Sequence, residues 1–94
     1  MTLALTQKVS LTEDVLLQEL AEESVLLNLE SEEYFGLDDV GTHMLSVLRT
    51  SASIQEACDS LTQEYDATPE KITTDLLELV DKLLTHGLVE VTDT

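Results

Sequence analysis

The spacing of apolar residues in this chain changes after residue 37, and this change limits the folds that the chain can adopt. Before it, two runs rich in Val and Leu span residues 15–20 and 24–29, and a brief run, YFGL, spans residues 34–37. The short polar segments AEE and ESEE connect these runs, as in antiparallel hairpins. The first third of the chain is therefore predicted to form a three-stranded antiparallel meander.

Beyond residue 37 the apolar residues follow helical spacing, and the caps of two helices can be identified. Asp38 or Asp39 can cap a first helix, which ends near the RTSAS segment. Ser53 and Glu56 form the S-x-x-E capping box of a second helix. Both helices carry an apolar stripe of the kind that packs against a core.

A third predicted helix has both a start and a stop signal. Thr68 precedes Pro69, which suits an N-cap followed by the first helical position, and Gly87 follows the last turn. The apolar arc of this helix is wide, so the helix either lies between two layers or leaves part of the arc for a partner. Residues 88–91 can form a last extended segment, in which Leu88 closes the helix end in a Schellman-type contact.

Three strands followed by three helices indicate an α+β fold rather than a parallel α/β sheet. The short helices with brief connections suit a helix-turn-helix-like arrangement. Ninety-four residues suffice for one compact domain, so we expect a single domain over residues 1–94.

The charge balance excludes two classes of partner. The chain has 20 acidic residues against four basic ones, a formal net charge of −16 at pH 7. Four scattered cations cannot neutralise nucleic acid phosphates or hold an anionic membrane surface. The acidity suits a basic or neutral partner, or serves solubility. The N-terminus lacks the basic and apolar regions of a secretory signal, and no window is apolar enough to span a membrane, so we expect a cytoplasmic protein.

Catalytic and metal-binding patterns are not found in the sequence. His43 and His86 lie far apart without ligand spacing, and the glycines are isolated, so we expect no metal and no cofactor. Cys58 lies on an apolar helical stripe and is predicted to be a small buried side chain. We therefore expect an interaction module and not an enzyme.

The order of elements and several phrases resemble the PqqD-like proteins, also called RiPP recognition elements. The resemblance covers about residues 9–91 and rests on VSLTEDVLLQEL, SVLLNLESEEYFGLDDVGTHMLSVL and the segment that runs from SIQEACDSL to LTHGLVEV. It implies a winged helix-turn-helix-like fold that binds the leader segment of a ribosomally made precursor peptide. The leader would add as an antiparallel strand to the third strand, against the third helix, and be presented to a leader peptidase, a cyclase or a radical SAM enzyme. The YFGLDD segment resembles the lasso-peptide members more than the pyrroloquinoline quinone pathway member.

An exposed strand edge offers unpaired N–H and C=O groups, which an added peptide strand can satisfy. We assign the peptide-binding edge to residues 33–37, which are Glu33, Tyr34, Phe35, Gly36 and Leu37. Tyr34 and Phe35 must point to opposite faces, and the sequence does not decide which one faces the peptide.

One face of the third helix is expected to form the opposite wall, through Ile72, Asp75, Leu76 and Leu79. The three apolar residues of this set suit the core equally well. Asp75 suits either an ion pair with the leader or a solvated surface.

Two other readings stay open: a winged-helix transcription regulator, which the charge disfavours, and an acidic dimeric scaffold. The strand edge permits either a monomer or a homodimer.

Overall fold

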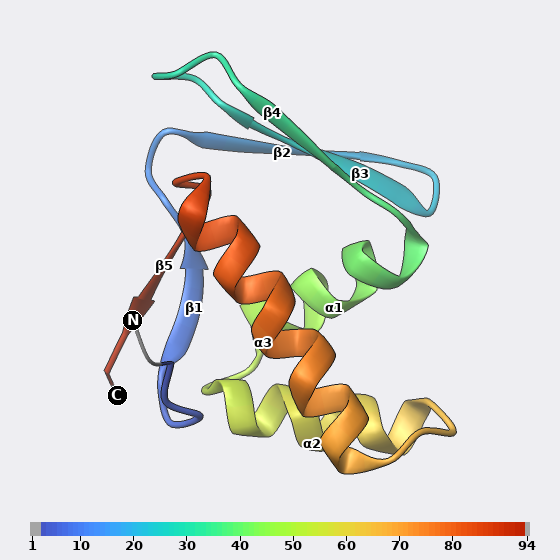
Figure 1. The fold of residues 1–94 in the computed structure, drawn as a ribbon. Coiled ribbons are helices and arrows are strands. Elements are labelled where there is room, and N and C mark those ends of the chain that lie inside the picture. The colour runs from blue at the N-terminus through green and yellow to red at the C-terminus, as the bar shows by residue number, and fades with distance from the viewer. Residues whose placement is uncertain (1–2, 94) are drawn as a thin grey trace.

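The computed structural model describes residues 3–93, and its upper layer is an antiparallel sheet of three strands (Figure 1). The strands lie in the order β2 (Val15–Leu20), β3 (Glu23–Asn28), β4 (Tyr34–Leu37). The register places Leu17 opposite Leu26, and Leu26 opposite Phe35. The predicted meander is confirmed, with β3 beginning one residue earlier than expected.

Three helices follow the sheet and lie below it in Figure 1. They are α1 (Asp39–Thr50), α2 (Ile54–Glu64) and α3 (Pro69–Thr85). The predicted α+β class, a three-stranded antiparallel sheet followed by three helices, is thus confirmed.

Each helix begins where a side chain accepts a hydrogen bond from the first turn. Asp38 accepts from the Gly41 N–H at 2.8 Å, Ser53 from the Glu56 N–H at 3.2 Å, and Thr68 from the Lys71 N–H at 3.2 Å. These bonds satisfy backbone donors that have no partner within the helix. Asp38, and not Asp39, is the cap of α1.

The end of α3 is a Schellman motif, as predicted. Gly87 has a φ of +68°, its N–H donates to the Leu84 carbonyl, and the Leu88 N–H donates to the Leu83 carbonyl. Glycine adopts this left-handed conformation without steric cost. The turn directs Leu88 into the core, where 1% of its surface is exposed.

A second, two-stranded sheet joins the two ends of the described chain. β1 (Lys8–Leu11) pairs antiparallel with β5 (Val89–Thr92), and Val9 lies opposite Val91. β1 was not predicted, because its partner lies about eighty residues away and no local hairpin signal marks it. β5 begins one residue later than the predicted extended segment.

One apolar cluster connects both sheets with all three helices. Its fully buried members include Val9 of β1, Leu26 of β3, Leu61 of α2, Leu76 of α3 and Leu88. The burial of such side chains is the main term that stabilises the fold.

Polar contacts attach α1 to its neighbours. Ser24 of β3 is 1% exposed, and its hydroxyl lies 2.7 Å from that of Thr42 on α1. The Lys8 ammonium donates to the carbonyls of Leu48 and Arg49, at 3.3 and 2.7 Å, where α1 ends. The positive charge thus meets the negative end of the helix dipole.

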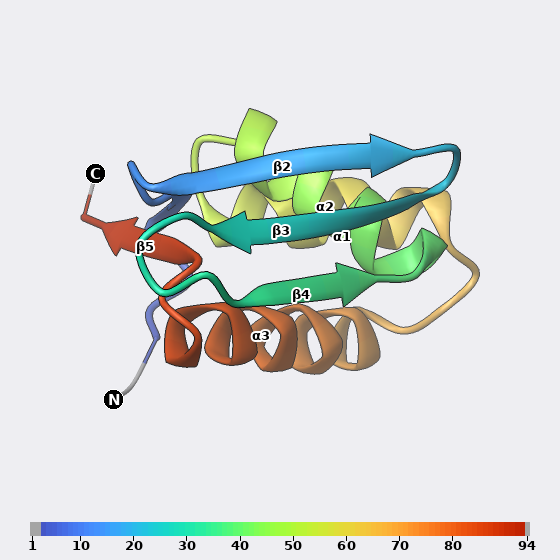
Figure 2. The ribbon, with the colours of Figure 1, turned by 90° about the horizontal axis from the view of Figure 1, so that it is seen from above.

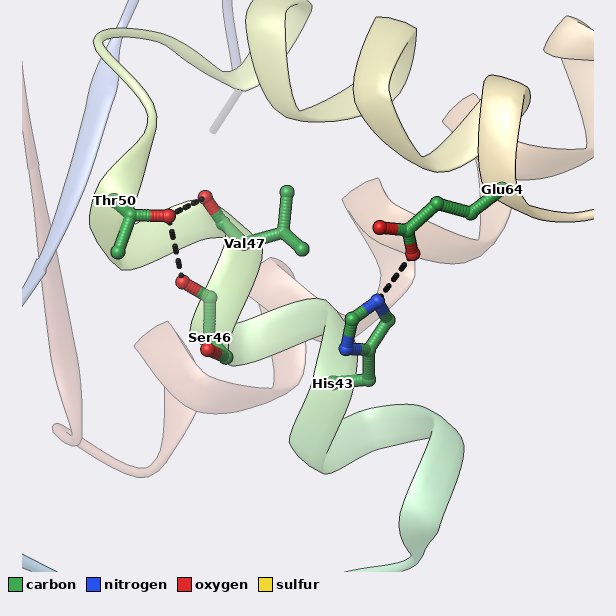
Figure 3. A network of polar contacts seen from close by, with 5 residues as sticks. All are labelled: His43, Ser46, Val47, Thr50 and Glu64. Carbon is green, nitrogen blue, oxygen red and sulfur yellow. Dashed lines mark hydrogen bonds and ion pairs between the residues drawn. The ribbon is translucent and has the colours of Figure 1, made fainter.

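On the far side of α1, the imidazole of His43 contacts the carboxylate of Glu64 on α2 (Figure 3). At the end of the same helix, the Thr50 hydroxyl donates to the carbonyls of Ser46 and Val47, at 3.1 and 3.2 Å. His43 is therefore a boundary residue that joins two helices. Within residues 3–93, no helix is long and apolar enough to cross a membrane.

Candidate functional site

The outer edge of β4 has no neighbouring strand among the described residues. The Asn28 N–H donates to the Glu33 carbonyl at 2.8 Å, so these two residues form a hydrogen-bonded pair of the β3–β4 ladder. Hydrogen-bonded and non-hydrogen-bonded pairs alternate along an antiparallel ladder. Phe35 and Leu37 therefore direct their backbone groups toward β3, whereas Tyr34 and Gly36 direct theirs away from the sheet. The edge offers two N–H and two C=O groups to an added strand.

The two aromatic side chains of β4 point to opposite faces of the sheet. Phe35 lies on the face toward the helices, and its ring meets that of His86 edge-on, with centroids 5.1 Å apart. Tyr34 lies on the face away from the helices and is 77% exposed. The structure thus decides a question that the sequence left open: Phe35, and not Tyr34, points toward α3.

The end of α3 approaches β4 at this contact, and its beginning lies farther from the sheet (Figure 1). Leu79 lies two turns before His86 on the same side of the helix, and Asp75 lies one turn before Leu79. Leu79 and Asp75 are both half-buried. We call this side, formed by Asp75, Leu79, Lys82 and His86, the β4 flank of α3.

The opposite flank of α3 does not face β4. Thr73 interacts with the Cys58 thiol on α2, and Leu84 lines a small pocket with Leu3 and Asp81. Leu79 and Leu84 are therefore similar half-buried leucines on two different sides of one helix.

Two of the predicted wall residues lie beneath the surface. Ile72 is 3% exposed and Leu76 is 0% exposed, and both belong to the apolar cluster. They form the buried layer between the two flanks and have no free surface for a peptide. Of the predicted wall, Asp75 and Leu79 remain accessible.

Asp75 has a partner within its own helix. Its carboxylate accepts a hydrogen bond from the Lys71 ammonium at 3.1 Å, one turn earlier. The Lys71 side chain is 67% exposed, so this surface pair adds little to stability, and either partner can exchange it for a ligand group.

Sequence reasoning missed Lys82 and His86, although their spacing contained the signal. Starting at Asp75, the positions i, i+4, i+7 and i+11 are Asp75, Leu79, Lys82 and His86. His86 is the C-cap of α3. Its contact with Phe35 depends on the tertiary fold and leaves no local mark in the sequence.

The remaining reactive groups do not form a site. Burial raises the pKa of the Cys58 thiol above its ordinary value, which keeps the thiol protonated and unreactive. Within residues 3–93, no three His, Cys, Asp or Glu side chains lie close enough together to hold a metal ion.

The comparisons with known proteins concern segments that include both β4 and α3. A family model described as coenzyme PQQ synthesis protein D (PqqD) matches residues 23–89, from β3 to the start of β5. Among solved structures, TbiB1 in complex with the TbiA(beta) leader peptide is 30% identical, with a TM-score of 0.80 over 85% of this chain and 93% of that chain.

A lasso peptide synthetase B1 complexed with the leader peptide has the same fold, with 24% identity and a TM-score of 0.80 over 88% of this chain and 98% of that chain. No curated protein sequence matches the chain. The family model spans more than half of the chain and includes both β4 and α3, and the chain belongs to the PqqD family.

Proposed function

We propose that this protein binds the leader segment of a ribosomally made precursor peptide and presents it to the enzymes that modify the peptide. The observation that carries the proposal is the free edge of β4, where Tyr34 and Gly36 direct their backbone groups outward. An added strand satisfies such groups. The similarity to TbiB1, which was solved with a leader peptide, supports this role. Strand addition requires no catalytic group, so we propose a binding protein without enzymatic activity.

In the proposed complex, successive leader side chains point to opposite sides, as in any strand. Those on the helix side meet Phe35, Leu79 and His86, so apolar or aromatic leader residues are expected there. Those on the other side lie beside Tyr34 and Gly36. Leu37 and the buried layer of α3, including Ile72 and Leu76, hold the two walls at their spacing.

The pathway follows from the same proposal. The aromatic pair in YFGLDD favours a lasso-peptide pathway, in which a leader peptidase receives the bound precursor. A radical SAM partner would indicate the pyrroloquinoline quinone type. A DNA-binding role is disfavoured, because the sheet and its turns carry exposed carboxylates.

The test is isothermal titration with the leader of the precursor peptide encoded beside the gene. Leu79→Ala is expected to weaken binding about tenfold, because it removes roughly half a leucine side chain's burial, about 1.4 kcal/mol, from the interface. Leu84→Ala is the matched control, since Leu84 is also half-buried but lies on the opposite flank.

Leader binding by the unaltered protein that is weakened about tenfold by Leu79→Ala and kept by Leu84→Ala supports the site. Equal effects of the two substitutions would place the leader elsewhere. Failure of the unaltered protein to bind the leader would refute the function.

A further inference from the structure

The face of the three-stranded sheet that points away from the helices is apolar, and no described element covers it. Residue alternation places five apolar side chains on this outer face, Leu16, Leu20, Val25, Leu27 and Tyr34, together with the polar Gln18 and Glu23. Figure 2 looks onto the face, with the helices behind it. Leu16 and Leu20 are 52% and 55% exposed, although a surface strand in contact with water alone commonly carries polar residues here.

The outer face is also shaped to receive a side chain. Gly36 lies on it, and a Cβ placed there would meet no atom within 4 Å. Gly36 lines a hollow of about 310 Å³ together with the apolar residues Leu20, Val25 and Leu37 and the polar residues Glu23, Ser24 and Asp38. The chain itself does not require a glycine at this position, since the backbone φ of Gly36 is not in the left-handed region.

The charges around the outer face indicate what covers it. Residues 9–48, which contain all three strands and their turns, carry ten Asp and Glu residues and no Lys or Arg. All ten carboxylate residues are exposed. A second copy of the chain would bring the same charges and a net charge of −16 to the contact, so self-association through this face is opposed by repulsion.

We propose that the outer face is a docking surface for a different protein, whose contact surface has an apolar centre and a rim of Lys and Arg. The apolar centre would cover Leu16 and Leu20 and fill the hollow at Gly36. The basic rim would meet carboxylates such as Glu22 and Glu23. The outer face shares Tyr34 and Gly36 with the β4 edge, but its exposed leucines, Leu16 and Leu20, lie on β2 at the opposite edge of the sheet, so the inference does not require that a leader be bound.

The probes are the leader peptidase and the other modifying enzymes encoded beside the gene, each purified with an affinity tag. Their affinity for the chain is measured by biolayer interferometry. The double variant Leu16→Thr, Leu20→Thr keeps strand propensity and removes the apolar centre. Val40→Thr is the matched control, because Val40 is also an exposed apolar residue, 43% exposed, but lies on α1.

At least one enzyme is expected to bind the unaltered chain, and the double variant is expected to weaken that binding more than tenfold, whereas Val40→Thr leaves it within twofold. A second variant, Glu22→Lys with Glu23→Lys, is expected to weaken it at least fivefold, and binding is expected to fall steeply with added salt. Circular dichroism checks the fold of each variant, and the leader is expected to bind all of them normally.

Three results would overturn the inference: no binding by any of the enzymes, unchanged affinity of the double leucine variant, or a dimer in analytical ultracentrifugation that the leucine substitutions abolish. Failure of the unaltered chain to bind the leader would instead refute the proposed function and leave this inference standing.

Discussion

Replacement of Gly36 by proline tests the β4 edge directly. The N–H of Gly36 points away from β3, so proline removes no bond of the existing sheet, and edge strands tolerate proline in this orientation. In the proposed complex, the same N–H and the neighbouring C=O form one hydrogen-bonded pair with the leader. The proline ring replaces the donor and occupies the space of the incoming carbonyl, so that both bonds of this pair are lost.

The size of the effect follows from the number of bonds. A main-chain hydrogen bond contributes about 1 kcal/mol net, so the loss of two costs about 2 kcal/mol and weakens leader binding about 30-fold. Fluorescence anisotropy with a labelled leader measures the affinity, and circular dichroism verifies the fold.

Two further variants serve as controls. Gly36→Ala keeps the N–H, and its Cβ meets no atom, so near-normal leader binding is expected. Glu19→Pro removes an N–H that points outward from β2, at the opposite edge of the sheet. The direction of this N–H follows from the β2–β3 ladder, in which the Leu29 N–H donates to the Asp14 carbonyl and thereby sets the alternation. The edge assignment is refuted if folded Gly36→Pro binds the leader normally, or if Glu19→Pro is the variant that loses it.

Three further predictions concern stability and reactivity. Lys8→Met is expected to lower the free energy of unfolding in urea by about 1–2 kcal/mol, because it removes a charged donor from the carbonyls at the end of α1. Lys82→Met, at an exposed lysine, is the control and should change this free energy by less than about 0.5 kcal/mol. Ala21→Gly should raise the free energy of unfolding by up to about 1 kcal/mol, since Ala21 has a φ of +59° in the two-residue β2–β3 turn. Glu22 has no positive φ, so Glu22→Gly should lower this free energy. The reverse order would contradict the strain argument. The Cys58 thiol, whose pKa burial raises, should react with a disulfide reagent at pH 8 only after unfolding in guanidinium, and rapid reaction of the native protein would contradict its burial.

The helices were the most predictable part of the fold, because their signals are local. A cap needs only its own side chain and the backbone three residues later, as Ser53 and Glu56 illustrate. The Schellman end of α3 is equally local, since Gly87 and Leu88 complete it with residues of the last turn. Such signals survive without knowledge of the tertiary structure.

The features that escaped prediction depend on contacts between distant residues. β1 exists because β5 returns beside it, and KVSL alone contains little to distinguish it from a loop. The burial of Leu76 and the accessibility of Leu79 likewise depend on where the neighbouring elements, among them α2 and β5, lie around α3, because the apolar arc of that helix includes both leucines. The β4 strand itself was predictable, but the directions of its two rings required the register with β3.

The opposite directions of Tyr34 and Phe35 have a consequence for the precursor gene. A strand added to β4 continues the same pleat, so alternate codons of the leader encode residues that point to opposite faces of the sheet. Insertion of one codon within the paired segment would exchange the two sets, whereas insertion of two codons would restore them beyond the insertion. Leaders that evolve with this protein are therefore expected to vary in length by pairs of residues within that segment.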